Sequence, residues 1–168
     1  MSSIEKNSSL NIGSKIKDYL KLIKPSLSIM VVFSSVLAYL LVPGIESKYV
    51  NPLQMTILLA IGGLLVTGSA NAINQAVEKN TDAMMKRTSS RPVAAGRMSV
   101  TEAWVFAIVT GAVGIFILEN YFNWTSAGLA FFSLFLYAFI YTPLKKVNAI
   151  AVLVGAFPGA LPCLIGWA

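Results

Sequence analysis

The stretch NQAVEKNTDAMMKRTSSRP, residues 74–92, gathers polar and charged side chains between two long apolar segments. Asn74, Glu78 and Asp82 recur at intervals of four residues, so on a helix they form one polar stripe. A basic cluster follows directly and comprises Lys86, Arg87 and Arg91. Acidic residues at helical spacing followed by basic residues indicate a site for a divalent cation and a phosphorylated ligand.

The composition on either side of this stretch places the chain in a lipid bilayer. Of its 168 residues, 56% are hydrophobic and 12% are charged, and the mean hydropathy is +0.71. So few charges cannot cover a soluble globule of this size. The chain also has long intervals without Asp, Glu, Lys or Arg, and one helical span needs roughly 20 apolar residues. We therefore predict an all-α, multi-pass transmembrane bundle with five spans, at about residues 25–43, 52–73, 101–118, 125–142 and 148–168.

The basic residues alternate from loop to loop. Of the 13 Lys and Arg residues, only Lys48 falls outside the three segments before the first span, between the second and third, and after the fourth. This positive-inside pattern predicts a cytoplasmic N-terminal arm, residues 1–24, and a cytoplasmic loop at residues 74–97. We expect an integral protein of the cell (inner) membrane of a bacterium. The pattern also explains the net charge of +6, so no nucleic-acid partner is expected.

The scarce residue types narrow the choice of metal. The sequence has no histidine, which leaves no imidazole for a zinc site, a haem axial ligand or a Ser-His relay. Its single cysteine, Cys163, cannot form an internal disulfide. Any metal is therefore a hard cation on oxygen ligands. Glu78 and Asp82 are the candidate ligands of Mg²⁺, which they would hold together with a diphosphate.

The spacing of these two carboxylates suits that chemistry. Carboxylates four residues apart on a helix lie about 6 Å from each other, and Mg²⁺ takes one or two carboxylates and completes its shell with water and phosphate. A diphosphate held in this way leaves more readily, because the metal and nearby Arg or Lys neutralise the developing charge. The commoner origin of such a cluster is a solvated loop at the end of a membrane helix, and this alternative stays open.

Three further features of the sequence have two interpretations each. Tyr137, Tyr141 and Lys145 end the fourth predicted span, where they would either anchor it at the interface or reach a phosphate. Asn71 would either extend the polar stripe or hydrogen-bond to a neighbouring helix. The fifth predicted span contains several Gly and Pro residues, which predict a kinked or interrupted helix that packs against neighbours or lines a cavity.

The whole string from Asn74 to Pro92 resembles the first polar motif of the intramembrane prenyltransferases related to 4-hydroxybenzoate polyprenyltransferase. Its second half, M-x-R-T-x-x-R-P followed by G-R-M-S, is similar to the branch that makes haem O, the protohaem IX farnesyltransferases. The segments YTPLKKVN, residues 141–148, and GAFPGALPCLIGW, residues 155–167, are also similar to that branch.

The resemblance runs from about residue 21 to the end of the sequence, and it implies an all-helical fold of about nine spans, of which this chain would contain the N-terminal five. It implies two acidic motifs that bind Mg²⁺ and farnesyl diphosphate. The first maps onto Asn74, Glu78 and Asp82, and the diphosphate contacts onto Lys86, Arg87, Arg91 and Lys145. Haem B would be the second substrate, and haem A synthase or cytochrome oxidase assembly factors would be partners.

The resemblance also implies that part of the site is missing. No acidic residue follows Glu119, so we expect a fragment that lacks the second acidic motif and is inactive by itself. The expected reaction of the whole protein is farnesyl transfer to the vinyl group of haem B.

Two alternatives to this reaction stay open. The first is prenylation of an aromatic quinone precursor, against which the R-T-x-x-R-P string and the two lysines after YTPL argue. The second is a non-enzymatic channel or transporter segment with the stripe as a cation-binding mouth. The adjoining arginines would repel a cation and argue against it.

Overall fold

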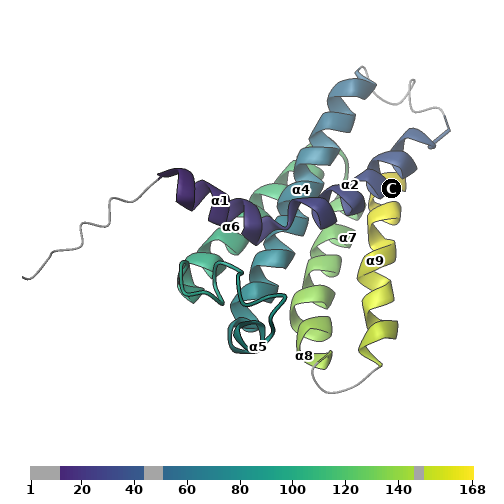
Figure 1. The fold of residues 1–168 in the computed structure, drawn as a ribbon. Coiled ribbons are helices and arrows are strands. Elements are labelled where there is room, and N and C mark those ends of the chain that lie inside the picture. The colour runs from purple at the N-terminus through teal and green to yellow at the C-terminus, as the bar shows by residue number, and fades with distance from the viewer. Residues whose placement is uncertain (1–11, 44–50, 146–149) are drawn as a thin grey trace, which may run out of the picture.

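The computed structural model describes residues 12–43, 51–145 and 150–168, and all regular structure in these ranges is helical (Figure 1). The predicted all-α fold class is therefore confirmed. In chain order the elements are α1 (Ile12–Ile23), α2 (Pro25–Leu40), α4 (Pro52–Val77), α5 (Lys79–Met84), α6 (Val100–Tyr121), α7 (Trp124–Phe135), the π-helical η1 (Leu136–Tyr141), α8 (Thr142–Leu144) and α9 (Ala151–Trp167).

Helices occur over all five predicted spans. Within the described residues, three helical segments are long and apolar enough to cross a membrane, namely Pro52–Val77, Val100–Tyr121 and Trp124–Leu144. A fourth results if α1 and α2, which are bent by 50° relative to each other, are counted as one. The apolar helix α9 is shorter than these. The assignment of all five ranges as membrane spans stays a prediction.

Three helices, α4, α6 and α7, begin where the sequence supplies a capping side chain. At the start of α4 the Asn51 side-chain oxygen accepts a hydrogen bond of 3.1 Å from the Gln54 amide. The Ser99 hydroxyl accepts a hydrogen bond of 2.9 Å from the Glu102 amide at the start of α6. The Asn123 carbonyl oxygen accepts one of 2.8 Å from the Ser126 amide at the start of α7. Each cap satisfies an amide that has no partner within its own helix, which fixes where the helix begins.

The helix α4 lies at the centre of the bundle and packs closely against α6 (Figure 1). A methyl group added at Gly114 would lie 2.9 Å from the backbone oxygen of Gly62 and 2.9 Å from a methyl of Val66. Near the other end of this contact, the Ser69 hydroxyl donates a 2.7 Å hydrogen bond to the Ala107 carbonyl. Small residues along α4 therefore serve close helix packing.

The helix α9 packs against α2 and α7 as one continuous element. Pro158 and Pro162 both lie inside it, so of the predicted kinked or interrupted helix the interruption is not found, and the predicted packing against neighbours is confirmed. The Ser35 hydroxyl of α2 donates a 2.7 Å hydrogen bond to the Pro162 carbonyl. A methyl group added at Gly166 would collide with the Ser35 carbonyl, so a glycine is required at this crossing.

The amphipathic helix α1 lies across α4 and α6 rather than along them (Figure 1). Its Lys15 ammonium pairs with Glu102 of α6 at 3.0 Å, and its Asp18 carboxylate pairs with Arg97 at 3.0 Å. Both partners are at the end of the bundle where α5 and the following loop lie. The second half of the predicted N-terminal arm is thus a helix fixed to that end.

The close approach of α4 and α6 predicts opposite effects for two glycine substitutions. Gly114→Ala should lower the free energy of unfolding by about 1–2 kcal/mol, because overpacking outweighs the gain in helix propensity. Gly128→Ala on α7, where an added methyl meets no atom within 4 Å, should raise it by about 0.5–1 kcal/mol. Unfolding of both variants in mixed detergent micelles, followed by circular dichroism, measures the difference. Equal shifts for the two variants would contradict the packing described.

Candidate functional site

The polar stripe lies at the end of α4 and in α5, with a helix break between its members. Glu78 terminates α4 with φ −96° and ψ 10°, and α5 begins at the next residue. The Asp82 amide still donates to the Glu78 carbonyl at 2.8 Å, so the spacing of one turn is kept across the break. The prediction of one helix carrying the stripe is wrong in this respect. Asn74, Glu78 and Asp82 are only 1%, 6% and 1% exposed, which does not match the solvated-loop alternative.

Lys145, from the end of the fourth predicted span, contacts the first half of the stripe. Its ammonium lies 2.9 Å from a carboxylate oxygen of Glu78 and donates to the side-chain oxygen of Asn74 at 3.0 Å. The Asn74 amide group in turn donates to the other Glu78 oxygen at 2.9 Å. These three side chains form a closed triangle of hydrogen bonds around a buried charge.

Arg91 contacts the second half of the stripe. One of its guanidinium nitrogens donates to both carboxylate oxygens of Asp82, at 2.8 and 2.7 Å. Thr88 fixes the turn between them, because its hydroxyl donates to the Asp82 backbone carbonyl at 2.9 Å. A carboxylate that is 2% exposed needs such a partner to remain charged. The structure thus brings five of the predicted site residues together, Asn74, Glu78, Asp82, Arg91 and Lys145.

The other two predicted diphosphate contacts lie apart from this cluster. Lys86 and Arg87 follow α5 and are exposed. Their charged ends form no ion pair with any residue that the structure describes. Their role as diphosphate contacts stays a prediction.

Lys24 lies close enough to the charged cluster to interact with it electrostatically, and the sequence placed it in the N-terminal arm. It lies ahead of the apolar helix α2, at the bend after α1. Its burial, followed by the charges of Arg91 and Lys145, lowers its pKa to about 8, and Asp82 and Glu78 oppose this shift. The available signal was the Lys-Pro dipeptide, since a residue before proline is disfavoured in a helix.

The bend at Lys24 is held by polar side chains of α4. The Gln75 amide group donates to the backbone carbonyls of Lys21 and Leu22, at 3.2 and 3.0 Å. The Asn71 amide group donates to the carbonyl of Ile23 at 2.9 Å. These are the last carbonyls of α1, which have no partners within the helix. Asn71 therefore makes the helix-packing hydrogen bond that was one of its two interpretations.

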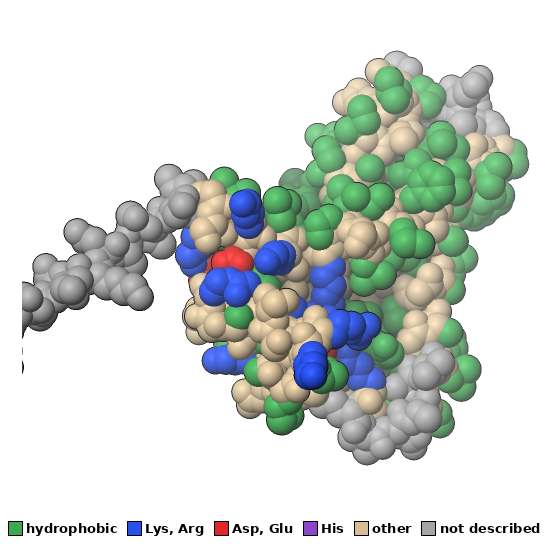
Figure 2. Space-filling view, viewed as in Figure 1, with side chains coloured by type: hydrophobic (Ala, Val, Ile, Leu, Met, Phe, Trp, Pro, Cys, Tyr) green, Lys and Arg blue, Asp and Glu red, His purple; other side chains and the backbone are tan. Residues whose placement is uncertain are grey.

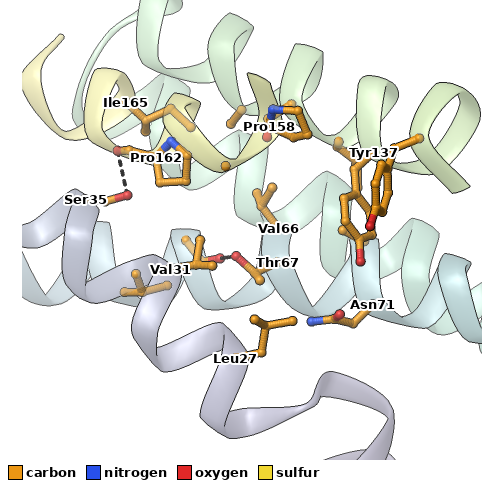
Figure 3. A pocket seen from close by; sticks show the side chains of 18 of the residues that line it. Leu27, Val31, Ser35, Val66, Thr67, Asn71, Tyr137, Pro158, Pro162 and Ile165 are labelled. Atoms are coloured by element: carbon orange, nitrogen blue, oxygen red, sulfur yellow. Dashed lines mark hydrogen bonds between the residues drawn. The ribbon is translucent and has the colours of Figure 1, made fainter. Parts of the chain in front are cut away.

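A cavity of about 500 Å³ lies between α2, α4, α7 and α9 (Figure 3). Asn71 and Tyr137 line the end near the site, and Ser35 and Ile165 line the opposite end (Figure 3). Most of the remaining lining residues are apolar. Tyr141 also lines the cavity, and the Lys145 ammonium lies 5.4 Å from the centroid of its ring. The apolar cavity therefore ends beside the charged cluster.

The side chains at the site suit a Mg²⁺ ion whose shell is completed by water and phosphate. They do not suit a metal that is enclosed by protein ligands alone. In the described ranges no three Asp, Glu, His or Cys side chains group to hold a metal ion. Glu78 and Asp82 are two carboxylates one turn apart, which suffices for Mg²⁺ when phosphate and water oxygens complete its shell. The adjacent Arg91 and Lys145 supply the donors that phosphate oxygens require. These residues would hold Mg²⁺ and a diphosphate together.

The surface around the site is basic. Figure 2 shows Lys and Arg side chains gathered at the end of the molecule where α1 and α5 lie, and apolar side chains over much of the rest. Such a potential attracts anionic ligands.

Comparison with known proteins agrees with these features. Residues 28–168 match the model of the UbiA prenyltransferase family. The chain is 45% identical over 158 residues to a protein of Flavobacterium johnsoniae named protoheme IX farnesyltransferase, with 94% of this chain and 52% of the relative covered. It is 41% identical over 158 residues to the mitochondrial protoheme IX farnesyltransferase of Debaryomyces hansenii, with 94% of this chain and 33% of the relative covered.

The fold has a counterpart among solved structures. A structure described as a UbiA homologue from Archaeoglobus fulgidus bound to GPP and Mg²⁺ superposes with a TM-score of 0.73 at 17% sequence identity, and 89% of this chain and 53% of that chain are covered. The chain spans about half the length of the curated bacterial relatives it matches. Because the family model matches most of the sequence, the resemblance to the intramembrane prenyltransferases is confirmed, and the chain belongs to the UbiA prenyltransferase family.

Proposed function

We propose that the protein transfers a farnesyl group from farnesyl diphosphate to the vinyl group of haem B, with addition of water and release of diphosphate, to give haem O. The observation that carries the proposal is the charged cluster at the end of an apolar cavity. This arrangement suits a ligand with an anionic head and an apolar tail. The names of the relatives support the choice of a farnesyl donor and a haem acceptor.

The residues of this chain would act first by binding the head group. In the structure Arg91 and Lys145 neutralise Asp82 and Glu78. A diphosphate competes for the same two cations, because phosphate oxygens match guanidinium and ammonium donors well. Mg²⁺, when bound, would supply positive charge that makes diphosphate a better leaving group.

The cavity would act on the other product of ionisation. When the C–O bond of an allylic diphosphate breaks, a carbocation forms that water would consume, and an apolar cavity excludes water. Tyr137 and Tyr141 line the cavity at the end near the site, and their rings stack with centroids 5.2 Å apart. Aromatic faces attract cations, as the Lys145 ammonium near the Tyr141 ring illustrates. The two rings would stabilise the carbocation until the vinyl group captures it.

The contacts of the cluster favour this function over the alternatives. A cation alone would have to displace Lys145 and Arg91 from Glu78 and Asp82 and would leave both without a counter-ion, whereas a diphosphate offers them a new one. A quinone precursor would use the same diphosphate site, so the choice of acceptor must be tested directly. The magnesium dependence, the cytoplasmic orientation of the site end and the location in a bacterial cell (inner) membrane belong to the proposal. Association with haem A synthase or cytochrome oxidase assembly factors stays a prediction from the resemblance.

The proposed reaction can be tested in a chimera, since the chain spans about half of its bacterial relatives. Residues 21–168 replace the matching segment of the Flavobacterium johnsoniae relative, and membranes are incubated with farnesyl diphosphate, haem B and Mg²⁺. We expect a farnesylated haem by mass spectrometry. Asp82→Asn should reduce its formation about a hundredfold or more, because one of the two carboxylates proposed to hold Mg²⁺ against the diphosphate is lost.

Glu119→Gln is the matched control, because it also replaces a carboxylate by an amide. Glu119 lies near the C-terminal end of α6, whereas the start of α6, with Glu102, lies at the charged end of the bundle. This control should leave turnover unchanged. Undiminished turnover of Asp82→Asn would remove Asp82 from the site. A chimera that inserts normally but prenylates an aromatic quinone precursor in place of haem would overturn the proposed acceptor.

The pairing of Glu78 with Lys145 predicts a compensating double substitution. Lys145→Met should lower the free energy of unfolding by about 1–3 kcal/mol, because it leaves the buried Glu78 charge without its partner. Adding Glu78→Gln should recover most of this loss, since glutamine keeps a hydrogen bond with Asn74 and carries no charge. Denaturation in mixed micelles measures both variants.

The pair of Lys15 with Glu102 is the control, because its side chains are 35% and 28% exposed. Lys15→Met should cost less than about 1 kcal/mol. If the double variant is as unstable as the sum of its single changes, Lys145 does not neutralise Glu78.

A further inference from the structure

One lysine lies beside the charged cluster without a counter-ion of its own. Lys24 is half-buried, and its charge interacts unfavourably with Arg91 and Lys145 and favourably with Asp82 and Glu78. Within the described ranges its ammonium forms no ion pair or hydrogen bond. A partly buried cation without a partner is costly, so an anionic ligand beside it would be favoured.

The backbone holds this lysine in place by an unusual conformation. Lys24 has φ 53° and ψ 71°, and it is the only non-glycine residue with positive φ among those described. This region is unfavourable for a side chain with a Cβ atom, and such strain persists only where the surroundings fix it. Here they do, because Asn71 and Gln75 bind the carbonyls before it. The Ser28 hydroxyl also donates to the Ile23 carbonyl at 2.8 Å.

The elements that hold the bend also relate it to the site. Asn71, Gln75 and Glu78 are spaced by four and three residues at the end of α4, so they share one helix face. Asn71 and Leu27 both line the cavity at this end. Lys24 therefore lies where the head group of a ligand would lie when its apolar tail occupies the cavity.

Lys24 differs from Arg91 and Lys145, because each of those two side chains already has an ion-pair partner. Arg91 and Lys145 are already bound to Asp82 and Glu78 at 2.7 and 2.9 Å, so a phosphate must break an ion pair to reach either one. Lys24 can be contacted without that cost. Three cations face two carboxylates in this region, which leaves the site attractive to an anion.

We propose that Lys24 is a further diphosphate-binding residue, and that a diphosphate in the site contacts its ammonium before it displaces Arg91 and Lys145 from their carboxylates. The inference rests on the proposed function, in which the ligand is a prenyl diphosphate. A phosphate oxygen held by Lys24 lies close enough to compete for Arg91 and Lys145. Their transfer to the diphosphate releases both carboxylates. Lys24 thus couples ligand entry to the opening of the two ion pairs.

The test measures binding of inorganic pyrophosphate to the whole chain in lipid nanodiscs, by isothermal titration calorimetry with and without Mg²⁺. Lys24→Gly removes the ammonium and suits the positive φ, so its unfolding temperature should not fall. Its affinity for pyrophosphate should fall roughly ten- to hundredfold, the effect of losing a charge-assisted hydrogen bond. Lys24→Arg, which keeps the charge, should retain most of the affinity.

Two further variants make each outcome decisive. Lys17→Ala removes an exposed lysine of α1 and should bind pyrophosphate like the unmodified chain. An equal loss in Lys17→Ala would assign the effect to overall charge and overturn the inference. If Lys24→Gly does not fold, Lys24→Asn replaces it, since asparagine tolerates the left-handed region.

The result also separates this inference from the proposed function. Unchanged affinity in a folded Lys24→Gly or Lys24→Asn variant would overturn the role of Lys24 and leave the proposed function standing. No pyrophosphate binding by the unmodified chain, with or without Mg²⁺, would overturn this inference, whereas the proposed function is decided by turnover of the chimera.

Discussion

The pairing of two buried carboxylates is the constraint on which the charged end of this molecule depends. Glu78 and Asp82 lie beside an apolar cavity, where an isolated charge would be costly. Each is neutralised by a cation from another segment, Lys145 after the fourth predicted span and Arg91 after α5. The first pair holds the end of α8 against the end of α4, and the second holds the loop after α5 against α5. The four side chains that pair with one another here are also those that a metal and a diphosphate would use. Binding of the metal and the diphosphate must therefore break the two ion pairs and give each side chain a new partner.

The helix α4 organises the bundle through two different kinds of contact. Its middle packs closely against α6 through small residues such as Gly62 and Ser69. Its end carries amides that bind the last carbonyls of α1, and these fix the bend before α2. The bend places Lys24 next to the carboxylates and Leu27 on the cavity wall. One helix therefore determines both the apolar space for a tail and the charged surroundings of a head group.

Much of the local structure could be predicted because it depends on neighbours in sequence. Apolar segments of sufficient length predicted helices over all five ranges, and the cap that begins α6 comes from Ser99, a neighbour in sequence. The break at Glu78 could not be foreseen, since the spacing of the stripe is kept across it. The sequence also left open whether the range of α9 is a kinked or an interrupted helix. Prolines are strong local signals for a break, but the packing of this helix against α2 and α7 overrides them.

The sequence by itself determined the membrane class, the all-α fold, the acidic stripe and the family resemblance, because composition, spacing and motif are properties of the chain alone. Only the tertiary structure decided which charges meet. Lys145 was one of several basic candidates until α8 placed it on Glu78, whereas Lys86 and Arg87, next to the stripe in sequence, are exposed and form no ion pair with a described residue. Lys24 was counted with the N-terminal arm until the bend brought it to the site. A buried carboxylate takes as counter-ion the cation that the packing of helix ends brings within reach, and distance along the chain does not specify that choice.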